Sequence, residues 1–146
     1  MKTVGVIGIG DMGSGLARNL IKAGYSVTGI DLLPHRQDAF VEMGGQLAAS
    51  PADVGRASDV VYIMVMTGTQ AKRVLLGPDG AVAHMKAGGA VILTATIHAS
   101  EAREIAEAMA GTGVHLIDSP VSGGFPGAQG GTLTMMAAAP DAVLDD

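Results

Sequence analysis

Three glycines near the start of the chain have a spacing that could support chemistry. They stand in the segment GIGDMG, residues 8–13, which follows a G-x-G-x-x-G pattern. We expect Gly8 to permit a tight turn, Gly10 to let a phosphate approach the backbone, and Gly13 to let a helix pack closely. The N–H groups at the start of that helix, and its positive end, would then face a diphosphate. The pattern predicts a dinucleotide site made by Gly8, Ile9, Gly10, Asp11, Met12 and Gly13. Two other interpretations stay open, namely glycines that only make turns and a different nucleoside cofactor such as S-adenosylmethionine.

A carboxylate, Asp31, follows the next apolar segment of the chain. At that place a carboxylate can accept hydrogen bonds from the ribose hydroxyls of adenosine, and its charge repels a 2′-phosphate. The neighbouring Leu32 offers no cation to offset that repulsion. We therefore expect NAD rather than NADP, although His35 and Arg36 are near enough in the sequence to keep NADP open. The alternative for Asp31 is a solvated carboxylate in a turn.

The elements that position these residues alternate along the chain between strand-like apolar segments and helix-like amphipathic segments. Strands are expected at residues 3–9, 25–30, 60–66, 90–93, 114–117 and 132–138, and helices at 12–23, 34–43, 51–57, 69–76, 81–85 and 100–110. Residues 120–131 are expected to be rich in loops, and a helix is expected to open at residue 140. This alternation predicts an α/β protein, a three-layer Rossmann fold with a doubly wound, mostly parallel sheet, as a single domain over residues 1–146.

Composition excludes several classes of protein. The net charge is −5 and aromatic residues make up 3% of the chain, so nucleic-acid binding has no basic surface to use. There is no cysteine, which removes disulfides and thiolate metal sites. No apolar run reaches the roughly 18 residues that a membrane span needs. We expect a cytoplasmic protein with no membrane segment and no metal.

Three segments of the chain, the first of which contains the glycine pattern, carry a resemblance to a known family. Residues 6–20, VIGIGDMGSGLARNL, resemble the opening signature of the β-hydroxyacid dehydrogenases, which include 3-hydroxyisobutyrate, L-threonate and 6-phosphogluconate dehydrogenases. Residues 118–124, DSPVSGG, resemble the family's D-A-P-V-S-G-G substrate loop, and GTLTMM at residues 131–136 resembles the segment after it. The resemblance covers essentially the whole chain. It implies NAD-dependent oxidation of the CH–OH group of a small 3-hydroxy acid similar to 3-hydroxyisobutyrate or L-threonate.

The resemblance also implies roles for individual residues. Val65 and Met66 match a pair beside the cofactor that is usually Leu-Pro in the family, so Met66 is a departure that bears on the rigidity of this loop. Thr96 matches a threonine on the nicotinamide side, and Ala95 replaces the serine before it. The loop expected to bind the substrate carboxylate consists of Ser122, Gly123 and Gly124, a hydroxyl and open N–H groups that suit an anion. For Thr96 and Ser122, local capping of a turn is the alternative.

One part of the family's machinery has no match in this sequence. The resemblance implies a catalytic lysine in a G-x-x-G-x-G-x-x-x-K-x-x-N pattern and an all-helical second domain, both beyond Asp146. A group that transfers the proton typically contributes about 10²–10⁴-fold to the rate. We therefore expect these 146 residues alone to bind cofactor with little or no turnover. The alternative function is a non-catalytic NAD-binding or interaction module. We also expect a homo-oligomer, since apolar surface would be left exposed.

Overall fold

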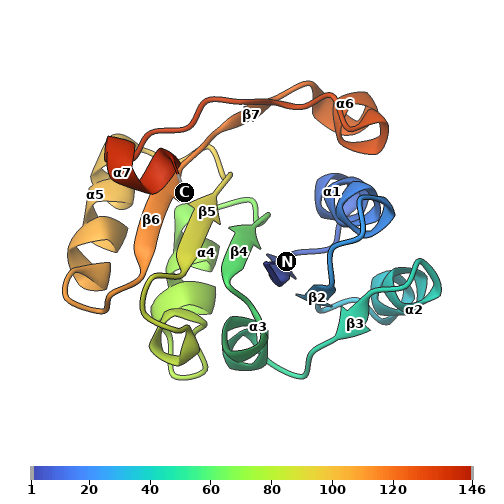
Figure 1. Cartoon of the computed structure of the whole chain (residues 1–146), viewed down its shortest axis with the longest axis horizontal. Coiled ribbons are helices and arrows are strands. Elements are labelled where there is room, and N and C mark those ends of the chain that lie inside the picture. Colours follow the sequence, from blue (N-terminus) through green and yellow to red (C-terminus); the bar gives the residue numbers. More distant parts are fainter. Residues whose placement is uncertain (1, 146) are drawn as a thin grey trace.

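A parallel sheet of six strands runs through the protein, as seen in a computed structural model that describes residues 2–145 (Figure 1). The strands lie in the order β3-β2-β1-β4-β5-β6. Their bounds are β1 (Val4–Ile7), β2 (Val27–Ile30), β3 (Gln46–Leu47), β4 (Val60–Ile63), β5 (Ala90–Leu93) and β6 (His115–Asp118). All four residues of β1 are buried, as expected of a central strand covered on both faces.

Helices cover both faces of this sheet and give it three layers. They are α1 (Asp11–Lys22), α2 (Pro34–Glu42), α3 (Pro51–Ala57), α4 (Gly68–Leu76), η1 (Val82–His84) and α5 (Ala99–Met109). Neighbouring residues of a strand point to opposite faces, and Val6 and Ile7 belong to different core clusters. The cluster that contains Val6 includes Phe40 of α2, whereas the cluster that contains Ile7 includes Leu75 of α4 and Ile105 of α5. The predicted α/β class and the doubly wound Rossmann architecture are confirmed.

The last quarter of the chain differs most from expectation. It contains β7 (Val121–Ser122), α6 (Gly124–Gly130), β8 (Thr134–Met135) and α7 (Asp141–Leu144). The prediction of a loop over residues 120–131 is wrong for the helix α6, which packs on α1. β7 and β8 pair with each other in an antiparallel way. Figure 1 shows this segment leaving β6, crossing above the sheet to α6 and returning to α7.

Two smaller differences concern the strands. β3 was not expected, because two residues are too short for a periodic signal. β4 ends at Ile63 rather than Met66, although the Met64 N–H still donates to the Ile7 carbonyl over 2.8 Å. Within residues 2–145 there is no helix whose length and apolar character would allow it to cross a membrane. The cytoplasmic location stays a prediction.

Candidate functional site

The strand order places a binding crevice at the carboxyl end of the sheet. The chain winds outward from β1 to β2 and β3 on one side and through β4, β5 and β6 on the other. In open α/β sheets, ligands bind beyond the carboxyl ends of the strands at the point where the order reverses. The final paired row of the sheet consists of Ile30, Ile7, Ile63, Leu93 and Asp118. The residues that follow this row lie along one edge, and they include the predicted Gly8, Asp31, Val65, Met66 and Thr96.

The three glycines of residues 8–13 are required for different reasons. Gly8 has a φ of +95°, and a Cβ there would lie 2.5 Å from the Met64 carbonyl oxygen. A Cβ on Gly13 would lie 1.9 Å from the Gly8 carbonyl oxygen. The fold itself therefore excludes side chains at Gly8 and Gly13. At Gly10, φ is −74°, and the nearest atom to a Cβ would be Nη1 of Arg36 at 3.4 Å, the end of a flexible side chain. Nothing rigid in the described chain excludes a side chain at Gly10, which leaves its space open to a ligand.

Helix α1 presents its amino end to the same space. No side chain caps this end among residues 2–145, because the N-cap residue is Gly10. The first N–H groups of a helix have no partner within the helix, so those of Asp11, Met12 and Gly13 can bind an anion. Ile9 differs from its neighbours, since its side chain is 2% exposed and its N–H donates to a carboxylate oxygen of Asp31. The geometry suits a diphosphate against Gly10, Asp11 and Met12.

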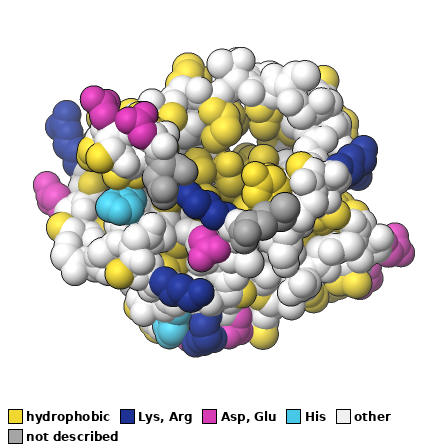
Figure 2. All heavy atoms as spheres, in the orientation of Figure 1, with side chains coloured by type: hydrophobic (Ala, Val, Ile, Leu, Met, Phe, Trp, Pro, Cys, Tyr) yellow, Lys and Arg dark blue, Asp and Glu magenta, His cyan; other side chains and the backbone are white. Residues whose placement is uncertain are grey.

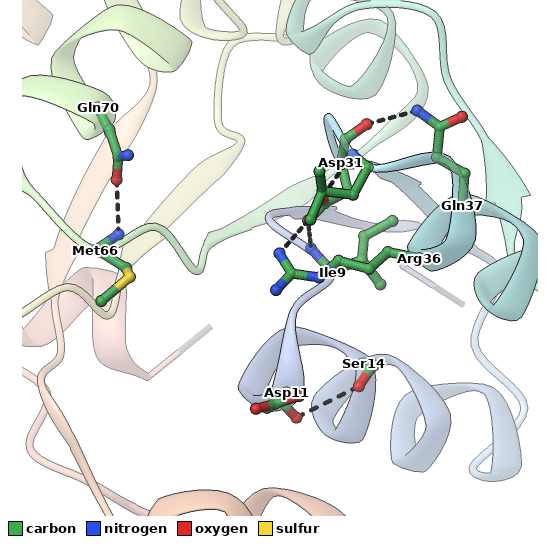
Figure 3. Close-up of polar contacts among 9 residues, drawn as sticks. Ile9, Asp11, Ser14, Asp31, Arg36, Gln37, Met66 and Gln70 are labelled. Atoms are coloured by element: carbon green, nitrogen blue, oxygen red, sulfur yellow. Dashed lines mark hydrogen bonds and ion pairs between the residues drawn. The ribbon is translucent and has the colours of Figure 1, made fainter.

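Asp31 lies beside this loop, as Figure 3 shows. Its Oδ2 accepts from the Ile9 N–H over 2.9 Å, and its Oδ1 accepts from the Leu33 N–H over 3.0 Å. Only 7% of the side chain is exposed, so the interpretation as a solvated turn carboxylate is wrong. Each carboxylate oxygen has a second lone pair, so Asp31 can still accept from ribose hydroxyls. Leu32, next to it, is 93% exposed.

The loop after β4 is held by the start of α4. The Gln70 Oε1 accepts from the N–H groups of Met66 at 3.0 Å and Thr67 at 3.2 Å, and the Gln70 N–H donates to the Thr67 hydroxyl. This capping box fixes the backbone of Met66 (Figure 3) without the proline that the family usually has. Val65 lies against Gly8, with 3.6 Å between its Cγ1 and the ideal Cβ position. Met66 is 87% exposed, so its side chain is available to a ligand at this edge.

The loop after β5 contains one structural and one exposed threonine. The buried Thr94 hydroxyl donates to the Ile63 carbonyl oxygen over 2.7 Å and ties the end of β5 to β4. Sequence reasoning did not single out Thr94, whose signal was only its place at a strand end. Ala95 is buried, and Thr96 is exposed at the rim. Thr94 thus anchors the loop that presents Thr96.

The predicted substrate loop is joined to the glycine loop through two helices. Ser122 is exposed and pairs with Thr134, and Gly123 and Gly124, with φ of +126° and +58°, lead into α6. The Asn19 side-chain amide on α1 donates to the carbonyl oxygens of Ala128 and Gln129 at 2.9 and 3.3 Å. The Gln129 amide donates to the carbonyl oxygen of Asp11 over 3.3 Å, and Gln129 also accepts from Arg18. Helix α6 therefore touches the first residue of α1.

Comparison with known proteins agrees with this geometry. Residues 3–146 match the family described as the NAD-binding domain of 6-phosphogluconate dehydrogenase. The chain is 40% identical to L-threonate dehydrogenase from Cupriavidus necator over 139 residues, which are 95% of this chain and 47% of that protein. It is 38% identical to 3-hydroxyisobutyrate dehydrogenase from Pseudomonas aeruginosa over 140 residues, 96% of this chain and 47% of that protein. The crystal structure of 3-hydroxyisobutyrate dehydrogenase from Salmonella typhimurium superposes with a TM-score of 0.93 at 36% identity, covering 99% of this chain and 50% of that one. The chain spans about half the length of these relatives.

Proposed function

The chain belongs to the family of NAD-binding domains of 6-phosphogluconate dehydrogenase, and from this premise we propose that it binds NAD along the carboxyl edge of its sheet and serves the oxidation of a small 3-hydroxy acid. The observation that carries the binding proposal is the space at Gly10. The fold requires glycine at positions 8 and 13, whereas a side chain at position 10 would meet only the flexible end of Arg36. Glycine at position 10 suits a ligand that approaches the backbone closely. That space faces the amino end of α1, which suits a diphosphate.

Each part of the dinucleotide has a proposed contact. The N–H groups of Gly10, Asp11 and Met12 hold the diphosphate, and Asp31 accepts from the adenosine ribose beside Leu32. Val65 and Met66 lie along the cofactor, and Thr96 lies on its nicotinamide side. When bound, NAD⁺ accepts a hydride from the carbon that carries the substrate hydroxyl. These assignments rest on the position of every residue beyond the last row of one sheet edge.

The proposed substrate contacts lie on the segment between β7 and α6. A hydroxyl at Ser122 and the N–H groups of Gly123 and Gly124 form a small cradle that suits a carboxylate. Two of the relatives are named for the hydroxy acids L-threonate and 3-hydroxyisobutyrate, which supports a small hydroxy acid as substrate here.

A second candidate function is an NAD-binding module without turnover of its own. Its support is the placement of the lysines. Lys22 ends α1, Lys72 of α4 pairs with Glu104 of α5, and Lys86 precedes the amino end of β5. None of these three lies at the carboxyl edge, so we assign the proton transfer to none of these three lysines.

Calorimetric titration with NAD⁺ tests the binding proposal. We expect the wild type to bind NAD⁺ and the Gly10→Ala variant to fold normally but bind at least about tenfold more weakly, because a methyl group displaces the diphosphate from the backbone N–H groups. Gly130→Ala is the matched control, since its Cβ would also be in ordinary contact, 3.6 Å from the Thr132 hydroxyl. A folded wild type that does not bind at about 1 mM NAD⁺, the upper end of ordinary enzyme affinities, would refute the proposal.

We also propose that the chain associates with copies of itself. Several large apolar side chains are exposed, and two of them, Met135 and Leu144, line one open hollow. Exposed apolar surface of this kind favours association.

A further inference from the structure

The guanidinium of Arg36 lies between Asp31 and Gly10, which are proposed to contact the adenosine ribose and the diphosphate. Arg36 belongs to the first turn of α2, and its Nη1 is 3.5 Å from Oδ2 of Asp31 (Figure 3). Three atoms of the same group lie 3.4 to 3.7 Å from the ideal Cβ position of Gly10. The side chain is 39% exposed, so one side faces Asp31 and Gly10 and the other faces solvent.

The nearby guanidinium changes the net charge that a bound phosphate would meet beside Asp31. The usual argument against NADP is that a bare carboxylate repels the 2′-phosphate. Here the carboxylate accepts hydrogen bonds from two backbone N–H groups and has a guanidinium beside it. Opposite charges at this distance largely offset each other as seen by a third group. A phosphate next to the Asp31–Arg36 pair would therefore meet a local charge close to neutral and a set of free N–H donors.

Arginine is also the side chain best suited to a phosphate monoester. Its planar group offers parallel N–H donors that match two phosphate oxygens. The other nearby basic side chain, His35, is exposed one residue earlier on α2 and has no such contact with Asp31 within residues 2–145. Of these two basic side chains, only Arg36 lies beside both Asp31 and Gly10 within residues 2–145.

We propose that Arg36 sets the cofactor preference of this site by pairing with the 2′-phosphate of NADP, so that the chain binds NADP as well as NAD and prefers NAD only moderately. This inference rests on the proposed function, since it concerns the same dinucleotide site. Asp31 holds the ribose hydroxyls of NAD, and Arg36 provides the partner for the extra phosphate of NADP. The ligand feature recognised is a phosphate monoester on the ribose beside Asp31.

The test compares NAD⁺ and NADP⁺ by calorimetric titration of the wild type, Arg36→Gln and Arg103→Gln. Arg103 is an exposed arginine on α5, so its variant removes the same charge away from the site. We expect Arg36→Gln to weaken NADP⁺ binding at least about tenfold, the effect of losing a charge-assisted hydrogen bond, and NAD⁺ binding much less. Adenosine 2′,5′-bisphosphate and 5′-AMP, used as fragments, should show the same difference. Arg103→Gln should leave both dinucleotides unchanged.

The outcomes separate the inference from the function on which it rests. If Arg36→Gln weakens NAD⁺ and NADP⁺ equally, the guanidinium serves the shared diphosphate and the inference is overturned. If it changes neither, Arg36 has no role in binding and the inference is also overturned. If the folded wild type binds neither dinucleotide, the proposed function itself fails. Thermal melts of each variant show whether the fold is kept.

Discussion

Two carboxylates tie the central strands together at opposite ends of the sheet. Asp31 accepts from the Ile9 N–H at the carboxyl end. At the amino end, Oδ2 of Asp59 accepts from the N–H of Thr3 at 2.8 Å and from its hydroxyl at 2.9 Å. The residue type is the same, but Asp31 lies at the proposed dinucleotide site, whereas Asp59 joins the start of β4 to the start of β1. Asp59 is therefore expected to serve stability, and Asp31 to serve binding as well.

The pH dependence of stability should show the role of Asp59. Hydrogen bonds from the Thr3 backbone and then from its hydroxyl lower the pKa of Asp59 below its usual value of 3.8. A carboxyl with a lowered pKa in the folded state stabilises the protein above the unfolded pKa, and this contribution is lost as pH falls through the folded pKa. We expect Asp59→Asn to lower the free energy of unfolding by about 1 kcal/mol at neutral pH. The difference from wild type should shrink as pH falls below about 4.

Denaturant melts at a series of pH values measure this difference. Asp79→Asn is the control, because Asp79 is an exposed carboxylate in the turn before η1. It should leave the pH profile as in the wild type. An Asp59→Asn profile parallel to that of the wild type down to pH values below both pKa values would contradict the role of Asp59.

At the scale of elements, local signals predicted most of the sheet and the glycine loop. The turn at Gly8 and the helix after it are encoded within a few residues, and so is the carboxylate at the end of β2. Helix α6 was not predictable in this way, because GFPGAQG contains three glycines and a proline, the poorest helix formers, and has no helical periodicity. It forms on the surface of α1, where a Cβ on Gly15 would lie 2.7 Å from the Ala128 backbone. The position of the Arg36 side chain over Gly10 likewise depends on contacts between elements.

Asn19 is the residue that should hold α6 in place. Its amide donates to two carbonyl oxygens of α6 and to the Gly15 carbonyl oxygen of its own helix. We expect Asn19→Ala to leave the sheet intact but to release α6, because two carbonyl groups lose their donor, at a cost of about 1–3 kcal/mol. Amide hydrogen exchange should then speed up at residues 121–136 and not in β1, β4 or β5. Lys22→Ala, at the exposed end of α1, is the control and should change neither region.

Release of α6 should also affect the glycine loop at residues 8–13, since Gln129 of α6 donates a hydrogen bond to Asp11. We expect weaker NAD⁺ binding in Asn19→Ala and recovery when NAD⁺ is saturating. Exchange that increases uniformly over the whole sheet would instead mean that Asn19 supports global stability and is not a specific tie to α6.

At the scale of the whole molecule, one face carries a hollow lined mainly by apolar side chains, together with Lys2, Asp59 and Lys86. It has a volume of about 780 Å³ and lies between the sheet and the segment from β7 to α7. Figure 2 shows hydrophobic side chains gathered in this hollow, with charged groups around it. Its lining includes Tyr62, Ile92, Ile117, Met135 and Leu144. Burial raises the pKa of the Tyr62 phenol above its usual value of 10.0.

Burial of the apolar side chains that line this hollow should favour the self-association proposed above. Met135 is 38% and Leu144 is 44% exposed, so covering the exposed remainder of each side chain contributes about 1 kcal/mol to association. We therefore expect sedimentation to show a mass that rises with concentration. Met135→Lys should raise the dissociation constant at least about tenfold, because a charge at the hollow would have to be buried. Val41→Lys is the control, since Val41 is 52% exposed on α2 and does not line the hollow. A wild type that stays monomeric at every concentration, or equal effects of the two variants, would mean that the hollow is not the contact between copies.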